Sequence, residues 1–313
     1  MSPPVQHGPP TADVPSGVTA GARVIPRVLS IAGTDPTGGA GIQADLKSVS
    51  ANGGYGMAVV TALVAQNTRG VRAVHVPPVS FLREQLDAVS DDVVIDAVKI
   101  GMLSTVAVID EVDGWLRRTR PPIVVLDPVM VATSGDRLLD EPAEAALRDL
   151  LSLAHIVTPN LPELAVLAEA PEATTWADAL AQALAVSAAH RVIVLAKGGH
   201  LGGDASPDAL VDAAGSFSGG RTVVQLAAER VATSNTHGTG CSLSSAIATQ
   251  QVLLGDWEHS LAAAKHWVTD SLRHADDLHV GRGNGPIHHF AALWAAADAF
   301  TSRKPVVKAM PVD

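Results

Sequence analysis

Short apolar runs rich in Val, Ile and Leu alternate with amphipathic, Ala- and Leu-rich stretches along the chain from Arg27 onward. Continuously apolar strands that are separated by helices are typical of a parallel sheet covered on both faces. We therefore predict an α/β protein, a three-layer α/β/α sandwich with a mainly parallel central sheet. The predicted strands are residues 28–32, 57–64, 97–100, 123–126, 155–157 and 192–196, and the predicted helices are residues 42–51, 81–89, 106–117, 142–151, 162–168 and 176–188.

The alternation changes between residues 209 and 231. Two apolar runs there, residues 209–211 and 222–226, flank a segment rich in Gly and Ser, as in a β-hairpin or an edge ribbon. Three further helices are predicted at residues 240–254, 258–274 and 288–300.

Neither an internal repeat nor a linker interrupts the middle of the chain, so we predict one domain over residues 27–301. The Pro-rich residues 1–26 lack the apolar stretch of a signal peptide, and we interpret them as a disordered extension. Residues 302–313 have the composition of a C-terminal tail.

The charge balance narrows the possible partners. The chain has 22 basic and 32 acidic residues, a net charge of −10, and no long run of one sign, which argues against nucleic acid or a membrane surface as partner. A phosphate-bearing substrate stays compatible with this charge, because backbone N–H groups can bind it.

The cysteine content indicates the compartment. The single cysteine, Cys241, excludes an intrachain disulfide and fits a reducing compartment. No apolar run approaches the length of a membrane span. We expect a cytoplasmic protein.

Ligands of open parallel sheets bind outside the carboxyl ends of the strands, so the loops there are where chemistry is expected. The first such loop, residues 33–41, is rich in Gly and opens a helix. A tight strand-to-helix turn explains this loop as well as a ligand site does. The chain contains neither the Walker A nor the Rossmann glycine pattern.

A second Gly-rich turn precedes the Ala-rich helix predicted from residue 240. The N–H groups of Gly238, Thr239, Gly240 and Cys241 would converge at the positive end of that helix. Such a site suits an anion and the charge that develops during phosphoryl transfer. A helix cap by Thr239 would need neither glycine, so we favour the anion site.

Three more loops carry polar residues just after predicted strands. Asp127, Asn160 and Glu163 lie there, and separate carboxylates fit Mg²⁺ held through water. Taken singly, each is also common as a turn former or helix cap. Lys197 ends another strand, where it could neutralise a nucleotide phosphate or be solvated surface.

Two other kinds of site are disfavoured. The histidines at 266, 274, 279, 288 and 289 lack zinc-site spacing, and we expect them at the surface. No Gly-x-Ser-x-Gly elbow of a serine hydrolase is present.

Taken together, these loops resemble the hydroxymethylpyrimidine/phosphomethylpyrimidine kinases of thiamine biosynthesis, within the ribokinase-like superfamily. The resemblance covers nearly all of the chain from Arg27 to about Trp294. Its motifs are SIAGTDPTGGAGIQADLK (30–47), VTALVAQNTRG (60–70), KIGML (99–103), DPVM (127–130), TPNLPE (158–163), KGGH (197–200) and NTHGTGC (235–241).

The resemblance implies a ribokinase-like fold, commonly dimeric, and ATP with Mg²⁺ as cofactors. It implies that a small aminopyrimidine alcohol is phosphorylated first and its monophosphate second. Gln66 would hydrogen-bond the pyrimidine ring, and the substrate pocket would be completed by Gly33, Ala40, Asp45, Val64, Met102 and Val129. The catalytic group would be Gly238, Thr239, Gly240 and Cys241. The nucleotide and Mg²⁺ would be bound by Lys197, Asn160, Thr239, Asp127 and Glu163.

The residue chemistry agrees with these implied roles. A glutamine amide can both donate to and accept from an aminopyrimidine edge, and Met102 and the valines offer apolar faces. Gln66 can equally be a polar residue that ends a strand, with the short apolar residues belonging to the core.

Most ribokinase-like enzymes carry aspartate where Cys241 stands. We hypothesise that a neutral thiol avoids repelling the anionic monophosphate in the second step, and that the helix N-terminus lowers its pKa in the first. Alternatively, Cys241 only packs beneath the site.

Two other functions compete with this interpretation. One is a pyridoxal-type kinase, whose usual Gly-Thr-Gly-Asp motif differs at Cys241, and the other is a catalytically silent pyrimidine-binding protein. A sugar kinase is less compatible, because its pocket needs more polar groups.

Overall fold

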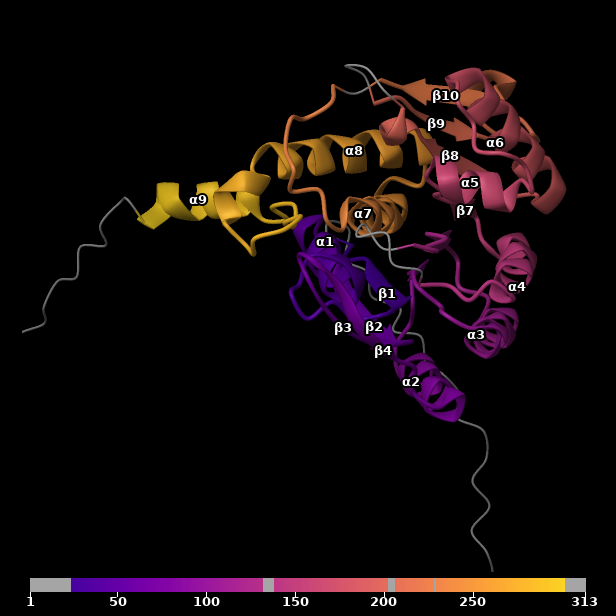
Figure 1. Ribbon diagram of the computed structural model, residues 1–313, viewed down its shortest axis with the longest axis horizontal. Coiled ribbons are helices and arrows are strands. Elements are labelled where there is room, and N and C mark those ends of the chain that lie inside the picture. Colours follow the sequence, from indigo (N-terminus) through magenta and orange to yellow (C-terminus); the bar gives the residue numbers. More distant parts are fainter. Residues whose placement is uncertain (1–23, 132–137, 202–205, 228, 302–313) are drawn as a thin grey trace, which may run out of the picture.

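Eight strands form one sheet in the order β10-β9-β8-β7-β6-β5-β1-β2 (Figure 1). In this computed structural model the described residues are 24–131, 138–201, 206–227 and 229–301. The predicted tail and residues 1–23 of the predicted extension lie outside them. The strands are β1 Arg27–Ala32, β2 Tyr55–Val60, β3 Leu63–Asn67, β4 Gly70–His75, β5 Ala97–Ile100, β6 Val124–Leu126, β7 Ile156–Val157, β8 Ile193–Lys197, β9 Asp208–Val211 and β10 Val223–Leu226.

The sheet is parallel from β2 to β8 and antiparallel at one edge. β1 pairs in parallel with β2 and β5, and the pairs β5–β6, β6–β7 and β7–β8 are also parallel. β9 and β10 pair antiparallel beside β8, which confirms the predicted edge ribbon.

Helices cover both faces of the sheet. Their bounds are α1 Gly41–Ala51, α2 Val79–Ser90, α3 Val106–Thr119, α4 Ala143–Leu150, α5 Leu161–Leu167, α6 Trp176–His190, α7 Thr239–Leu254, α8 Trp257–Arg273 and α9 Ala291–Thr301. No helix in the described ranges is both long and apolar enough to cross a bilayer.

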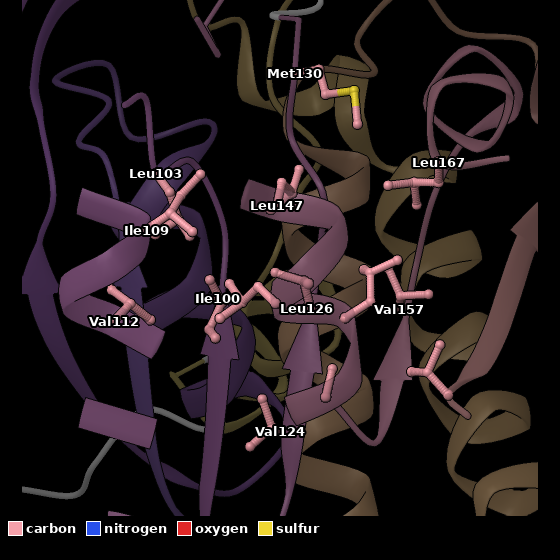
Figure 2. Close-up of a cluster of buried hydrophobic side chains, with 14 of the residues drawn as sticks. Ile100, Leu103, Ile109, Val112, Val124, Leu126, Met130, Leu147, Val157 and Leu167 are labelled. Atoms are coloured by element: carbon pink, nitrogen blue, oxygen red, sulfur yellow. The ribbon is translucent and has the colours of Figure 1, made fainter. Parts of the chain in front are cut away.

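Alternate strand residues face opposite layers, as the two-residue repeat of a strand requires. Leu29 and Ile31 of β1 pack in the core under α2 to α6, whereas Val28 packs in a second core under α1, α7 and α8. Figure 2 shows the first core, where Ile100 and Leu126 meet side chains from α3 and α4. The predicted three-layer architecture is confirmed.

One predicted strand, residues 57–64, is correct only in its first half, because β2 ends at Val60. The chain leaves the sheet after β2, and β3 forms a separate antiparallel ribbon with β4. Thr61 marks the exit, because its hydroxyl donates to the Met102 carbonyl oxygen at 2.6 Å. The apolar run continues through this bend because Ala62 and Val64 are buried in a small cluster outside the sheet.

Residues 288 and 289 also differ from prediction. They precede α9 rather than belonging to it, and both histidine side chains are buried rather than at the surface. The Nε2 atom of His289 lies 2.9 Å from the Ser242 hydroxyl, and burial lowers the pKa of His289 to about 3. His289 is therefore a neutral imidazole that packs against Ser242 of α7.

Candidate active site

A cavity of about 810 Å³ lies where the parallel strands end. Its wall includes the residues that follow β1, β5, β6, β7 and β8, and the first turn of α7. The predicted site residues that line it are Gly33, Ala40, Val64, Gln66, Met102, Asp127, Val129, Asn160, Glu163, Lys197, Gly238, Thr239, Gly240 and Cys241.

Asp45 is the predicted substrate-binding residue that the cavity wall does not include. Its side chain is completely buried and accepts hydrogen bonds from Lys99 Nζ at 2.8 Å and Ser245 Oγ at 2.8 Å. Ser30 Oγ donates to its other carboxylate oxygen at 2.6 Å. These hydrogen bonds hold the Asp45 carboxylate in the protein interior. The carboxylate does not reach the cavity, so the structure gives it no direct contact with a substrate there.

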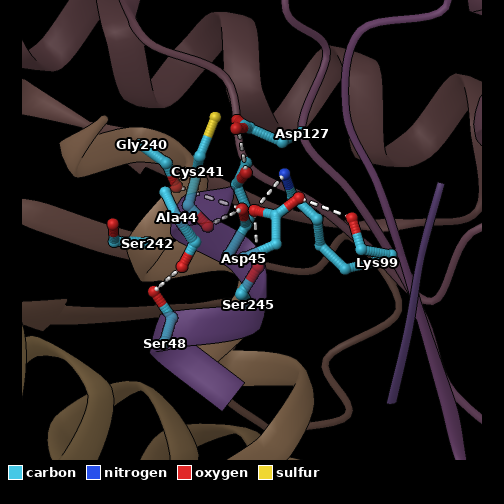
Figure 3. A network of polar contacts seen from close by, with 12 residues as sticks. Ala44, Asp45, Ser48, Lys99, Asp127, Gly240, Cys241, Ser242 and Ser245 are labelled. Atoms are coloured by element: carbon cyan, nitrogen blue, oxygen red, sulfur yellow. Dashed lines mark hydrogen bonds and ion pairs between the residues drawn. The ribbon is translucent and has the colours of Figure 1, made fainter. Parts of the chain in front are cut away.

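Lys99 is a charged residue at the site that the sequence analysis missed. Figure 3 shows Lys99 and Asp45 beside Cys241 and Asp127. Burial alone would lower the pKa of Lys99, but the negative charge of Asp45 raises it above the usual lysine value. A fixed positive charge therefore lies close to Cys241 at the start of α7. The signal was a single lysine inside the apolar run of β5, where a charge needs a partner.

One end of the cavity is apolar and suits a flat ring. Gly33 leaves space there, since a Cβ atom added to it would lie 3.0 Å from Met102 Sδ and 3.7 Å from a Val64 methyl group. The side-chain amide of Gln66, on β3, makes no hydrogen bond to another described residue. Its donor and acceptor are therefore available to a ligand.

The Gly-rich loop after β1 is organised by Asp35, which the sequence analysis did not single out. The buried carboxylate accepts hydrogen bonds from the N–H groups of Thr37, Gly39 and Ala40 at 2.8–3.0 Å. It also lies 2.9 Å from His237 Nε2. Burial would raise the pKa of Asp35, but hydrogen bonds from His237 and Thr37 hold it well below its usual range. Asp35 thus ties the first loop to the turn before α7.

That turn requires glycine at position 238. Gly238 has φ 79°, and a Cβ atom there would lie 1.7 Å from the Gly39 carbonyl oxygen. Thr239 does not cap the helix, because its hydroxyl donates to the Thr236 carbonyl oxygen at 2.7 Å. Among the described residues, the N–H groups of Gly240 and Cys241 have no hydrogen-bond acceptor. Both belong to the first turn of α7, which is the positive end of the helix dipole. This geometry suits an anion.

Cys241 is a neutral thiol in this setting. Burial raises its pKa to about 11, although the nearby charge of Lys99 acts in the opposite direction. The lowered pKa expected from the helix N-terminus is therefore wrong. The hypothesis also required a neutral thiol that would not repel an anionic monophosphate, and the raised pKa of Cys241 agrees with that part.

The cavity wall beside Gly240 carries two carboxylates and one ammonium, and a Cβ atom added to Gly240 would lie 3.4 Å from Lys197 Nζ and 3.7 Å from Asp127 Oδ2. Asp127 Oδ1 accepts from Thr158 Oγ1 at 3.0 Å and from Lys197 Nζ at 3.3 Å. Burial would lower the pKa of Lys197, but Asp127 and Glu163 raise it. Asn160 caps α5, with its Oδ1 accepting from Glu163 N at 2.9 Å. Its N–H donates to Glu163 Oε2 at 2.9 Å, which completes a capping box.

This donor set fits Mg²⁺ bound mainly to phosphates. No three His, Cys, Asp or Glu side chains in the described ranges converge into an all-protein metal site. Mg²⁺ usually keeps several waters and takes only one or two protein carboxylates. Asp127 and Glu163, both on the cavity wall, match that requirement.

Residues 35–288 match the phosphomethylpyrimidine kinase family. The chain belongs to that family. Hydroxymethylpyrimidine/phosphomethylpyrimidine kinase of Escherichia coli is 48% identical over 267 residues, which are 85% of this chain and 98% of that relative. Thiamine biosynthesis multifunctional protein ThiED of Corynebacterium glutamicum is 54% identical over 264 residues, 84% of this chain. The chain spans only 34% of that longer relative.

Solved structures place the fold in the ribokinase-like group. An ADP complex of Bacillus subtilis pyridoxal kinase has a TM-score of 0.77 at 32% identity, covering 86% of this chain and 99% of that one. Phosphomethylpyrimidine kinase from Clostridium difficile has a TM-score of 0.68 at 36% identity, covering 79% and 99%. The predicted family and fold are therefore confirmed.

Proposed function

We propose that this phosphomethylpyrimidine kinase family member uses ATP to phosphorylate 4-amino-5-hydroxymethyl-2-methylpyrimidine and then its monophosphate, for thiamine diphosphate synthesis. One observation carries the proposal: a single cavity joins the amide of Gln66 and an apolar ring pocket to the N–H groups of Gly240 and Cys241, and none of these groups has a hydrogen-bond partner among the described residues. The names of the Escherichia coli and Corynebacterium glutamicum relatives support the same activity.

The residues at one end of the cavity would bind the substrate, and those at the start of α7 would stabilise the transferring phosphoryl group. Gln66 would orient the aminopyrimidine, with Gly33, Val64 and Met102 against its ring. The N–H groups at the start of α7 would stabilise negative charge on the transferring group. Positioning and electrostatics of this kind dominate phosphoryl transfer, so a strong general base is not required. The neutral Cys241 thiol would admit an acceptor that already carries a phosphate.

The nucleotide side would use the carboxylates and the ammonium beside the anion hole. Asp127 and Glu163 would hold Mg²⁺ through its waters, Asn160 would fix Glu163, and Lys197 and Thr239 would contact nucleotide phosphates. When bound, Mg-ATP supplies the γ-phosphoryl group and part of the charge neutralisation. Lys197 is half-buried beside Asp127, whose charge raises the pKa of the lysine, so little reorganisation is needed to receive a phosphate.

A second candidate is phosphorylation of pyridoxal. The similarity to the Bacillus subtilis pyridoxal kinase structure favours it, and pyridoxal also bears a hydroxymethyl group on a flat ring. The two candidates share the anion hole and differ in what Gln66 must recognise.

The test incubates the purified chain with Mg-ATP and either the hydroxymethylpyrimidine or pyridoxal, and resolves the products by mass. Stepwise mono- and diphosphorylated pyrimidine is the expected result. Pyridoxal phosphate with little pyrimidine product would make the second candidate the main activity. No product from either, together with pyrimidine binding measured by calorimetry, would favour a silent binding protein. Gln66→Leu should raise the KM for the pyrimidine and leave that for ATP unchanged.

We also propose that residues 27–301 form the kinase domain, that it acts as a homodimer, and that it works in the cytoplasm. The resemblance to ribokinase-like kinases, which are commonly dimeric, supports the domain bounds and the dimer, and the single cysteine fits a reducing compartment. Light scattering of the purified chain gives the mass of the assembly, and a monomer at micromolar concentration would contradict the dimer.

A further inference from the structure

A segment outside the residues assigned above contacts both halves of the cavity. Residues 280–286, here called the glycine strap, follow α8 and contain Gly281, Gly283 and Gly285. On one side the strap meets the hairpin of β3 and β4, residues 63–75. On the other it meets the turn that precedes the anion hole.

The hairpin contact centres on Thr68, at its tip. The Thr68 hydroxyl oxygen accepts from Gly283 N at 3.2 Å and from Arg282 N at 3.3 Å. A Cβ atom on Gly283 would lie 2.1 Å from the Thr68 carbonyl oxygen, and one on Gly281 would lie 2.3 Å from the Thr68 hydroxyl oxygen. Only a strap of glycines can approach the tip this closely.

The contact with the anion-hole turn consists of three hydrogen bonds, one between main-chain groups and two from main-chain N–H groups to asparagine side chains. His237 N donates to the Gly285 carbonyl oxygen at 3.0 Å, directly before Gly238. Gly285 N donates to Asn235 Oδ1 at 3.0 Å, and Thr236 N donates to Asn284 Oδ1 at 3.0 Å. The strap therefore fixes the backbone that leads into Gly238.

Both ends of the strap are held by the protein body. Asn235 Nδ2 donates to Asp276 Oδ1 at 2.7 Å, just before the strap. After it, Ile287 is completely buried, and His288 N donates to the Ser271 carbonyl oxygen of α8 at 3.0 Å. Displacing the strap would disturb these anchors, so it is a firm support rather than a loose loop.

The hairpin needs such a support. β3 and β4 pair only with each other in the described residues, and an isolated two-stranded ribbon is marginally stable in water. Its base is held by Thr34, whose hydroxyl accepts from Val64 N at 3.0 Å. Its tip is held by the strap through Thr68. Gln66 lies between these two supports.

We propose that the glycine strap couples the ring pocket to the anion hole, with Thr68 as the positioning residue that fixes Gln66 over the cavity. This inference rests on the proposed function, since Gln66 is taken to recognise the pyrimidine. Thr68 acts through Gln66 and touches no reacting atom.

The test compares Gly283→Ala with Gly219→Ala. Gly219 lies in an exposed turn with φ 76°, where an added Cβ meets nothing within 4 Å, so alanine there strains only the local backbone, far from the hairpin. A displacement of about 1 Å at a positioning contact can be costly, so we expect Gly283→Ala to raise the pyrimidine KM about tenfold or more. The ATP KM should stay within about twofold, because the strap does not contact Lys197 or Asp127. Amide hydrogen exchange of residues 63–75 should become faster in Gly283→Ala and stay unchanged in Gly219→Ala.

A second pair of variants keeps the test decisive if Gly283→Ala does not fold. Thr68→Ala removes the acceptor and should raise the pyrimidine KM, while Thr68→Ser keeps the hydroxyl and should restore it. Unchanged pyrimidine KM and unchanged exchange of residues 63–75 in Thr68→Ala would overturn the coupling. Equal loss in both KM values and in thermal stability would also overturn it, as a general structural effect. If the native chain does not phosphorylate the pyrimidine, the proposed function fails, but hydrogen exchange still decides whether the strap holds the hairpin.

Discussion

The Nζ atom of Lys99 lies 2.8 Å from Oδ1 of Asp45, and neither side chain is exposed to solvent. The two residues are 54 positions apart in the chain and meet where β5 passes α1. Ser30 and Ser245 donate to the same carboxylate, so the pair is well hydrogen-bonded. A buried pair of this kind is costly to break, because removing one partner leaves an uncompensated charge.

Asp45→Asn should therefore destabilise the fold strongly. Loss of one partner of a buried ion pair typically costs about 3–5 kcal/mol, which urea unfolding can measure. The matched control is Asp113→Asn on α3, whose pair with Arg117 is at the surface and should be worth less than about 1 kcal/mol. Equal effects of the two substitutions would show that Lys99 does not depend on Asp45.

Gly238→Ala should abolish most activity, because the new methyl group cannot fit beside the Gly39 carbonyl oxygen. Loss of an oxyanion-type donor typically lowers kcat by about 100- to 1000-fold. Gly255→Ala, at the other end of α7, is the matched control, with φ 66° and nothing within 4 Å of an added Cβ. Steady-state kinetics should give near-native kcat for the control. Similar losses in both variants would mean that helix strain, and not the clash at the anion hole, limits the rate.

Cys241→Asp should impair the second phosphorylation more than the first. Two like charges about 4 Å apart at an effective dielectric of about 20 repel by on the order of 4 kcal/mol. We expect kcat/KM for the monophosphate to fall at least about tenfold more than that for the alcohol. Cys241→Ser, which stays neutral, should affect both steps alike. Native-like formation of the diphosphate by Cys241→Asp would contradict the role given to the thiol.

Much of the fold was predictable because its signals are local. The apolar run of β5 was predicted at the residues where it occurs, Ala97–Ile100. The Gly-Thr-Gly turn before α7 indicated an anion hole, since helix N-termini carry unpaired N–H groups wherever they occur. The loops after parallel strands converge by topology, which is why the loops after four strands were expected in one site.

What could not be predicted depends on contacts between distant segments. Asp35 and His237 are 202 positions apart, and nothing in either motif indicates that they meet. The break between β2 and β3 was hidden because Val64 stays apolar, being buried against Met102 rather than in the sheet. Asp45 was assigned to the substrate by resemblance, and its ion pair with Lys99 could be found only from the packing of α1 on the sheet.

Glu163 should make stability depend on pH in an unusual direction. Burial raises its pKa from 4.5 to about 7 in the folded protein. Between these pH values the folded state holds a proton that the unfolded chain has lost, so ionisation of Glu163 lowers stability as pH rises from about 5 to 8. Glu163→Gln stays neutral and keeps an acceptor for the Asn160 N–H, so it should escape this loss.

Urea unfolding at pH 5 and pH 8, without nucleotide, measures the difference. Relative to the native chain, Glu163→Gln should gain stability as pH rises, by at most on the order of 3 kcal/mol. The control is Glu84→Gln, which replaces an exposed carboxylate on α2 and should follow the native pH curve. If the curves of Glu163→Gln and the native chain run parallel, Glu163 is ionised throughout this range. It would then already be a carboxylate ligand for Mg²⁺ at the lower pH. If they diverge as expected, Mg²⁺ binding through Glu163 must strengthen as the pH rises, because the metal requires the deprotonated form.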